Sequence, residues 1–92
     1  MIVYAECEFF IPTAHSLKEK RAVLQRMLVR ARQKFNISAA EIDHQDVWQR
    51  TRLALVTVAS SREAADREMQ RVLYFLDSNS AWERLETETD YL

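Results

Sequence analysis

The 92-residue chain contains no glycine, and this absence removes several classes of nucleotide-binding site. At average usage a chain of this length has about six glycines. The dinucleotide-binding fingerprint, the phosphate-binding P-loop and the nucleophile elbow all need glycine, because a Cβ atom would obstruct their tight backbone turns. We therefore expect none of these sites, and most standard nucleotide-dependent enzymes are excluded.

Cysteine and long apolar segments are also scarce. The single cysteine, Cys7, excludes an internal disulfide and a thiolate metal cluster, and it is consistent with a reducing compartment. No apolar run approaches the roughly 20 residues of a membrane-spanning helix. The first ten residues carry two glutamates and no basic segment. We expect one cytoplasmic domain over residues 1–92, without a signal peptide and without a membrane partner.

The net charge of -1 hides a strong division of charge along the chain. Residues 18–34 contain seven basic residues and one acidic residue, a local charge of +6, so the remaining residues sum to -7. Residues 77–92 alone carry five acids against one arginine. The sequence therefore combines a basic segment with an acidic tail, and its near-neutrality does not exclude a polyanionic partner.

Hydrophobic periodicity predicts six elements in the order βαββαβ. Alternating or continuous apolar residues predict strands over 2–11, 36–44, 50–59 and 82–92, the third in a central position and the fourth at a charged edge. A capping box at 16–19 and helical spacing predict a helix over 17–34. A second box at 60–63 precedes a helix that ends at about Asp77. This order predicts a ferredoxin-like α+β fold, with two helices on one face of a four-stranded antiparallel sheet.

The same topology brings two polar segments together. Because the first and second strands run parallel, the loop at 12–15 and the hairpin at 45–49 emerge at one end of the sheet. Both histidines, His15 and His44, are expected at that end.

Two long motifs occupy these segments. HSLKEKR covers residues 15–21, and DHQDVWQR covers residues 43–50. With them the chain, over essentially its whole length, resembles the YlxP-like family of small bacterial proteins of uncharacterised function. It departs from that family at Tyr4 and Thr13, where glycine is common, so the loop before His15 is expected to be shaped differently or strained.

The resemblance implies three properties. They are a ferredoxin-like fold, no assigned enzyme activity, and a frequent genomic setting beside translation-initiation and ribosome-maturation genes. That setting suggests a role on the ribosome or on RNA.

The basic helix is the first candidate site. Arg26, Arg30 and Lys34 form one ridge at helical spacing, with further cations on the other flank of the apolar stripe. Like charges on a helix repel one another, and a phosphate-bearing partner would reduce that repulsion. The alternative is that these side chains pair with acids of the second helix or of the tail and only keep the domain solvated.

The two loops at the sheet end are the next candidates. The helix terminus at His15 and Ser16 could bind an anion, with help from Lys18, Lys20 and Arg21, although Ser16 and Glu19 already cap it. In the hairpin, Trp48 could stack on an unpaired base while Gln49 and Arg50 contact the nucleic-acid backbone. A purely structural network that fixes the hairpin explains the same residues.

A catalytic or metal site would have to use His15, His44, Asp43 and Asp46. No recognised metal-ligand spacing is present and no nucleophile stands out. We therefore predict no catalytic residue, no metal and no cofactor.

The sheet face away from the helices is expected to carry Ile2, Tyr4 and Phe10 among glutamates. Those glutamates would repel phosphate, so a homodimer through the Tyr4/Phe10 face is the better prediction for this surface.

The sequence thus favours a non-enzymatic protein that docks on ribosomal or other structured RNA. The alternative is an oligomerising interaction or small-ligand regulatory domain that uses the exposed sheet face. The candidate nucleic-acid or anion-binding residues are His15, Ser16, Lys18, Lys20, Arg21, Arg26, Arg30, Lys34, His44, Trp48, Gln49 and Arg50.

Overall fold

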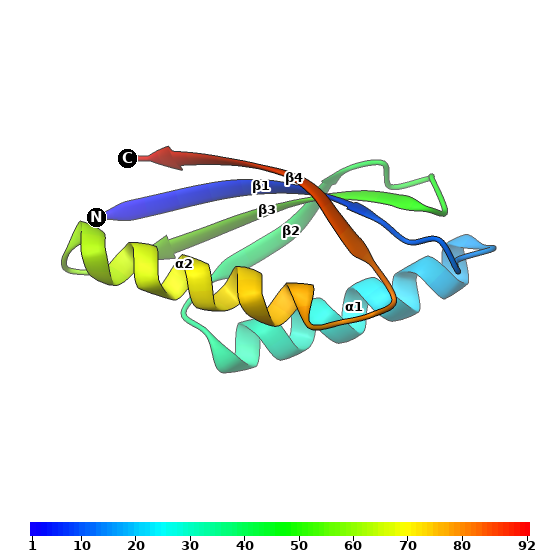
Figure 1. Ribbon diagram of the computed structural model, residues 1–92, viewed down its shortest axis with the longest axis horizontal. Coiled ribbons are helices and arrows are strands. Elements are labelled where there is room, and N and C mark those ends of the chain that lie inside the picture. The colour runs from blue at the N-terminus through cyan, green and yellow to red at the C-terminus, as the bar shows by residue number, and fades with distance from the viewer.

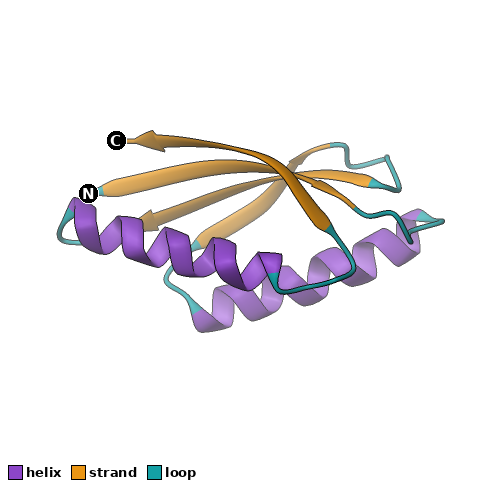
Figure 2. Cartoon of the chain, viewed as in Figure 1, coloured by secondary structure: helices purple, strands orange, loops and turns teal.

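Both helices lie against one face of a single antiparallel sheet, and the other face is uncovered (Figures 1 and 2). The computed structural model describes all of residues 1–92. Its elements are β1 (Ile2–Phe10), α1 (Leu17–Lys34), β2 (Ser38–Asp43), β3 (Arg50–Val58), α2 (Arg62–Asp77) and β4 (Glu83–Tyr91). The predicted ferredoxin-like α+β fold is confirmed.

The sheet order is β2-β3-β1-β4, and every neighbouring pair of strands is antiparallel. The predicted central place of β3 and edge place of β4 are both confirmed. Since β1 and β2 run parallel, the loops that follow them meet. The Ile11 backbone N–H donates to the Gln49 carbonyl at 2.9 Å, which joins the two loops directly.

Strict alternation along β1 builds the core. Val3, Ala5, Cys7 and Phe9 are completely buried beneath the helices, while the intervening residues point to the uncovered face. The Phe9 ring stacks on Trp82 with centroids 4.2 Å apart. The helices contribute Leu24, Met27, Leu28, Ala31, Ala65, Met69, Val72, Leu73 and Leu76.

The two helices begin at serine caps. At α1 the Ser16 hydroxyl accepts from the Glu19 N–H at 3.1 Å, and the Glu19 carboxylate accepts from the His15 N–H, so that capping box is confirmed. At α2 the cap is one residue later than predicted. Ser61 accepts from the Ala64 N–H at 3.1 Å, because α2 begins at Arg62.

β2 is shorter at both ends than the predicted strand. Asn36 is held outside it, since its N–H donates to Glu68 and its side-chain amide to the Val58 carbonyl. At the other end, His44 adopts a left-handed conformation with φ 65, which stops the extended chain after Asp43.

Burial of Cys7 has a chemical consequence. Its side chain is fully enclosed, and desolvation raises the pKa of the thiol above its ordinary value. A raised pKa lowers the thiolate fraction at a given pH. We therefore expect iodoacetamide at about pH 8 to modify the native protein at least about 100-fold more slowly than the urea-unfolded chain. Mass spectrometry over time measures both rates, and equal rates would contradict this account.

Candidate functional site

The surface of α1 carries six exposed cations that no carboxylate neutralises. One side of the helix packs into the core, and the rest faces solvent. None of the ion pairs in the structure includes any of these six side chains. We call them the α1 basic surface: Lys18, Arg21, Arg26, Arg30, Arg32 and Lys34.

The acids of α2 considered as alternative partners form no ion pair with this surface. Glu68 lies 3.2 Å from Arg71 and accepts from the Asn36 N–H, so its carboxylate is engaged within its own neighbourhood. Glu63 and Asp66 form no ion pair. The geometry therefore does not support the interpretation that internal pairing satisfies the basic helix.

Lys20 is the exception among the cations of α1. Its side chain is only 1% exposed, its ammonium lies 2.9 Å from the Glu41 carboxylate, and it donates to the His44 carbonyl. The predicted place of Lys20 in an anion site is corrected by this burial. This ammonium joins α1 to the end of β2 inside the protein and is not available to a ligand.

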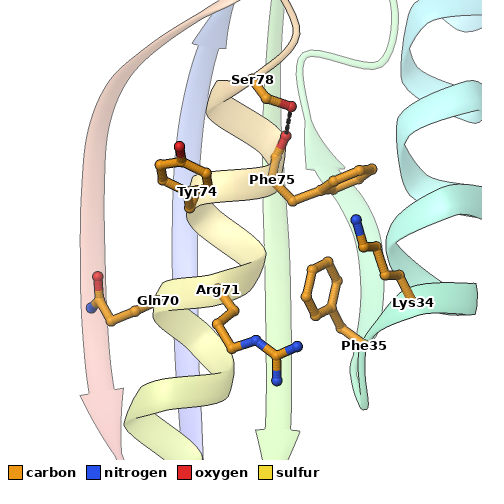
Figure 3. Close-up of a pocket in the computed structure, with 7 residues that line it drawn as sticks. All are labelled: Lys34, Phe35, Gln70, Arg71, Tyr74, Phe75 and Ser78. Carbon is orange, nitrogen blue, oxygen red and sulfur yellow. Dashed lines mark hydrogen bonds between the residues drawn. The ribbon is translucent and has the colours of Figure 1, made fainter.

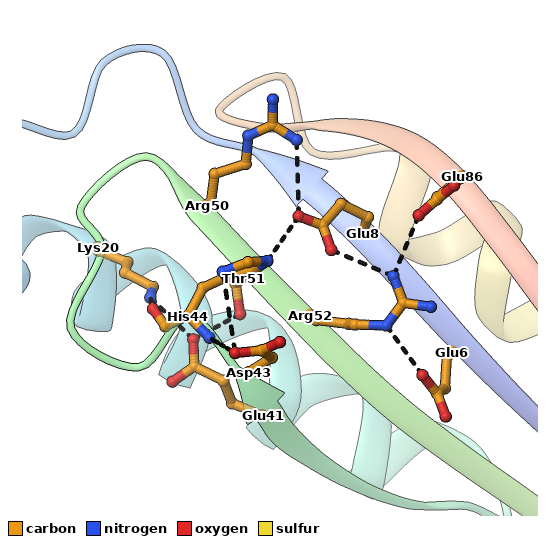
Figure 4. Close-up of polar contacts among 10 residues, drawn as sticks. All are labelled: Glu6, Glu8, Lys20, Glu41, Asp43, His44, Arg50, Thr51, Arg52 and Glu86. Atoms are coloured by element: carbon orange, nitrogen blue, oxygen red, sulfur yellow. Dashed lines mark hydrogen bonds and ion pairs between the residues drawn. The ribbon is translucent and has the colours of Figure 1, made fainter.

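The His44 side chain is engaged by the neighbouring strands, and 33% of it is exposed. Its Nε2 lies 2.9 Å from a Glu8 carboxylate oxygen, and the same oxygen is 3.5 Å from Arg50 Nη1 (Figure 4). These contacts bring the start of the hairpin onto β1. The structural network considered for the hairpin is therefore present, and it engages His44 and, in part, Arg50.

Gln49 fastens the loop that precedes α1. Its side-chain amide donates to the Pro12 carbonyl at 3.0 Å and to the Ala14 carbonyl at 3.3 Å. This loop contains no residue with positive φ, so Thr13 stands where the family usually has glycine without left-handed strain. The side chain of Gln49 thus holds the loop shape, which leaves it little capacity to contact a nucleic acid.

Other predicted residues at this end remain accessible. His15 is exposed, and 51% of Trp48 is exposed on the hairpin. His15 and His44 do not come together with acids in a metal-binding arrangement, because no group of three or more His, Cys, Asp or Glu could hold an ion. Ser16 is committed to capping α1.

The uncovered sheet face is organised by Arg52, which the sequence analysis does not single out. Its guanidinium contacts four carboxylates from β1 and β4, at distances from 2.8 to 3.3 Å, and Figure 4 draws Glu6, Glu8 and Glu86 among them. They are Glu6, Glu8, Glu86 and Glu88. The strand register explains this convergence, since Glu8 stands opposite both Arg52 and Glu86.

Hydrogen bonding within this cluster shifts the acid–base behaviour of its members. The Tyr4 hydroxyl donates to Glu6 at 2.7 Å, and this bond, followed by the bond from Arg52, lowers the pKa of the Glu6 carboxyl. The same bond raises the pKa of Tyr4, and hydrogen bonding to Glu6 raises that of Arg52. Four carboxylates around the single Arg52 guanidinium leave this cluster acidic overall, which makes it a poor surface for phosphates.

A hollow between the helices adds residues of α2 to the α1 basic surface. Two adjoining depressions, of about 460 and 260 Å³, share Phe75 and Ser78. We call them together the interhelical groove, and Figure 3 shows the larger one. The lining residues are Arg26, Met27, Arg30, Lys34, Phe35, Gln70, Arg71, Tyr74, Phe75, Ser78, Asn79 and Ser80.

The groove is cationic as well as aromatic. Arg26, Arg30, Lys34 and Arg71 all line it, and no carboxylate does. The ridge on α1 is evident from sequence spacing, but the contribution of α2 depends on how the helices pack. The outward spacing of Arg71 and Tyr74 on the second helix is the only sequence signal for that side.

Comparison with known proteins places this chain in a family. Residues 2–89 match the family described as "Protein of unknown function (DUF503)". The chain belongs to this family. A similar DUF503 relative is "Uncharacterized protein YlxP" of Bacillus subtilis (strain 168), which is 53% identical over 91 residues and matches over 99% of both chains. The predicted YlxP-like resemblance is confirmed.

The fold also has a counterpart among solved structures. The de novo designed protein Foldit4 superposes with a TM-score of 0.60 over 100% of this chain and 99% of its own, at 14% identity. At that identity the likeness concerns the DUF503 fold alone.

Neither helix of the chain is long and apolar enough to cross a membrane.

The internal role of Lys20 predicts a large effect on stability. In Lys20→Met the Glu41 carboxylate, 16% exposed, loses its ammonium partner and the His44 carbonyl loses a donor. Breaking one side of a buried ion pair should lower the free energy of unfolding by about 3 kcal/mol. Lys18→Met, at an exposed position, should change it by no more than about 0.5 kcal/mol. Urea unfolding compares the two, and equal stabilities would contradict the assigned role.

Proposed function

We propose that this DUF503-family protein is a non-enzymatic RNA-binding protein that docks on ribosomal or other structured RNA through the α1 basic surface. The observation that carries the proposal is the set of six exposed cations on one helix, none with a carboxylate within ion-pair distance. Unpaired like charges this close repel one another, and a polyanion would remove that repulsion.

The arrangement of the charges suits phosphates in a strand. Arg26, Arg30 and Lys34 follow each other at intervals of four residues, which is about 6 Å along a helix. Two of the three are arginines, whose planar fork binds phosphate oxygens in pairs. The genomic setting implied by the family resemblance makes ribosomal RNA the first RNA to test.

The proposed surface continues to the first turn of α1, where His15, Lys18 and Arg21 are exposed. It leaves out Lys20, His44 and Gln49, whose side chains are engaged within the protein. Trp48 is an exposed aromatic side chain that an RNA bound at this end could reach.

A matched pair of variants tests the proposal. Arg26→Gln with Arg30→Gln should weaken binding to ribosomal RNA and reduce the slope of log K against log salt concentration by about 2, because two phosphate contacts are lost. Arg62→Gln with Arg67→Gln removes the same charge from exposed positions of α2 outside the groove and should leave the slope unchanged. Filter binding at several salt concentrations measures both, with circular dichroism to verify folding.

Two results would contradict RNA docking through α1. One is the absence of any salt-sensitive binding by the unchanged protein. The other is an equal loss in both double variants, which would mean that affinity follows net charge and not this surface.

A second candidate function is self-association through the uncovered sheet face. The observation in its favour is a shallow hollow of about 330 Å³ lined by Tyr4, Ser38, Ala39, Ala40, Ala54, Leu55 and Val56. Ile2 and Val58, 38% and 57% exposed, extend this apolar area along the sheet. A second copy of the chain would bury it on both sides.

Sedimentation equilibrium tests this second function. The unchanged protein should show a concentration-dependent dimer that Val56→Lys dissociates, because a charge would be buried in the contact. Val47→Lys, on the exposed hairpin, is the matched control and should still dimerise. A single species of monomer mass at all concentrations would contradict self-association.

A further inference from the structure

Tyr74 is the most exposed aromatic side chain of the protein. It is 81% exposed on α2, compared with 51% for Trp48 and 43% for Tyr91. Tyr91 lies under Arg62, whose guanidinium carbon is 4.0 Å from the ring centroid, whereas Tyr74 has no such contact. The ring of Tyr74 therefore offers a flat surface on which another ring can stack.

The ring borders the same hollow as a row of cations. Tyr74 lines the same hollow as Lys34 and Arg71, and that hollow continues through Phe75 to Arg26 and Arg30. In Figure 3, Lys34 and Arg71 lie between the helices, and Tyr74 projects from the other side of α2. A ligand across this part of the protein meets positive charge in the groove and an aromatic surface at its rim.

Aromatic rings hold two of the cations in place. Lys34 Nζ lies 5.1 Å from the centroid of Phe75 and 5.9 Å from that of Phe35, and the Arg71 guanidinium carbon is 5.6 Å from Phe35. These contacts orient the charges over the groove without neutralising them. Only Arg71 has a carboxylate partner, Glu68.

We propose that the interhelical groove binds an unpaired stretch of an RNA strand, with phosphates on Arg26, Arg30 and Lys34 and a base stacked on Tyr74. The inference rests on the proposed function and adds its substrate class. A row of cations beside an exposed aromatic ring is the combination with which proteins bind single strands, because every base has a face that stacks. In a duplex the bases already stack on one another, so no base would be free to stack on Tyr74.

Fluorescence anisotropy tests the proposal with two labelled probes. They are an oligoadenylate of about twelve nucleotides and an RNA hairpin with a fully paired stem, closed by a short loop. The oligoadenylate should bind more tightly than the hairpin. Tyr74→Ala should weaken oligoadenylate binding about tenfold, since a stacked base is lost, and change hairpin binding little.

Three matched controls separate the ring from other effects. Tyr74→Phe keeps the ring and should bind as the unchanged protein does. Trp48→Ala removes the other well-exposed aromatic side chain and should have no effect on oligoadenylate binding. Adenosine monophosphate should compete only weakly, because it engages one phosphate where the strand engages several.

The outcomes distinguish this inference from the proposed function. Three results would overturn the groove proposal: Tyr74→Ala binds oligoadenylate normally, it loses affinity equally for both probes, or Trp48→Ala loses as much affinity for oligoadenylate. In each case salt-sensitive binding to ribosomal RNA would still stand. Competition by adenosine monophosphate as strong as that by the strand would overturn it in favour of a free nucleotide. If neither probe nor ribosomal RNA binds, both proposals fail.

Discussion

The covering of only one sheet face is the constraint on which the other features depend. Because both helices lie on the face formed by Val3, Cys7 and Phe9, the alternating residues Glu6 and Glu8 must face the other way. The acids of β1 and β4 are thus separated from the cations of α1 by the sheet itself. The basic segment and these strand glutamates therefore do not meet, which leaves the exposed cations of α1 without carboxylate partners.

The charged side chains of the two sides differ in whether they have partners within the protein. On the uncovered face, a single arginine, Arg52, contacts four glutamates, so these acids have a partner within the protein although the cluster stays acidic. Among the cations of α1, only Lys20 has a carboxylate partner, and it is also the one that is buried. Among the exposed cations of α1, Lys34 lies near the Phe35 and Phe75 rings, and Arg32 donates to the Ala39 carbonyl. This asymmetry makes the helical side the better candidate for an anionic partner.

The fold could be predicted from the sequence because it rests on local periodicity, whereas the site depends on contacts between distant elements. Alternation in β1 and the spacing of Arg26, Arg30 and Lys34 are visible in the printed chain. The sequence also holds a signal for the burial of Lys20, because this residue lies four positions before Leu24 on the apolar stripe. Its partner Glu41 is recognisable only after β2 is placed. The roles of Arg52 and Tyr74 likewise require strand register and helix packing.

An NMR titration with ribosomal RNA fragments would test most directly whether the helical side is the RNA interface. The account predicts that amide resonances of α1 and of the α2 segment from Gln70 to Ser78 shift or broaden, while those of the sheet around Arg52 stay in place. Shifts confined to the uncovered sheet face or the Trp48 hairpin, with α1 unperturbed, would contradict it.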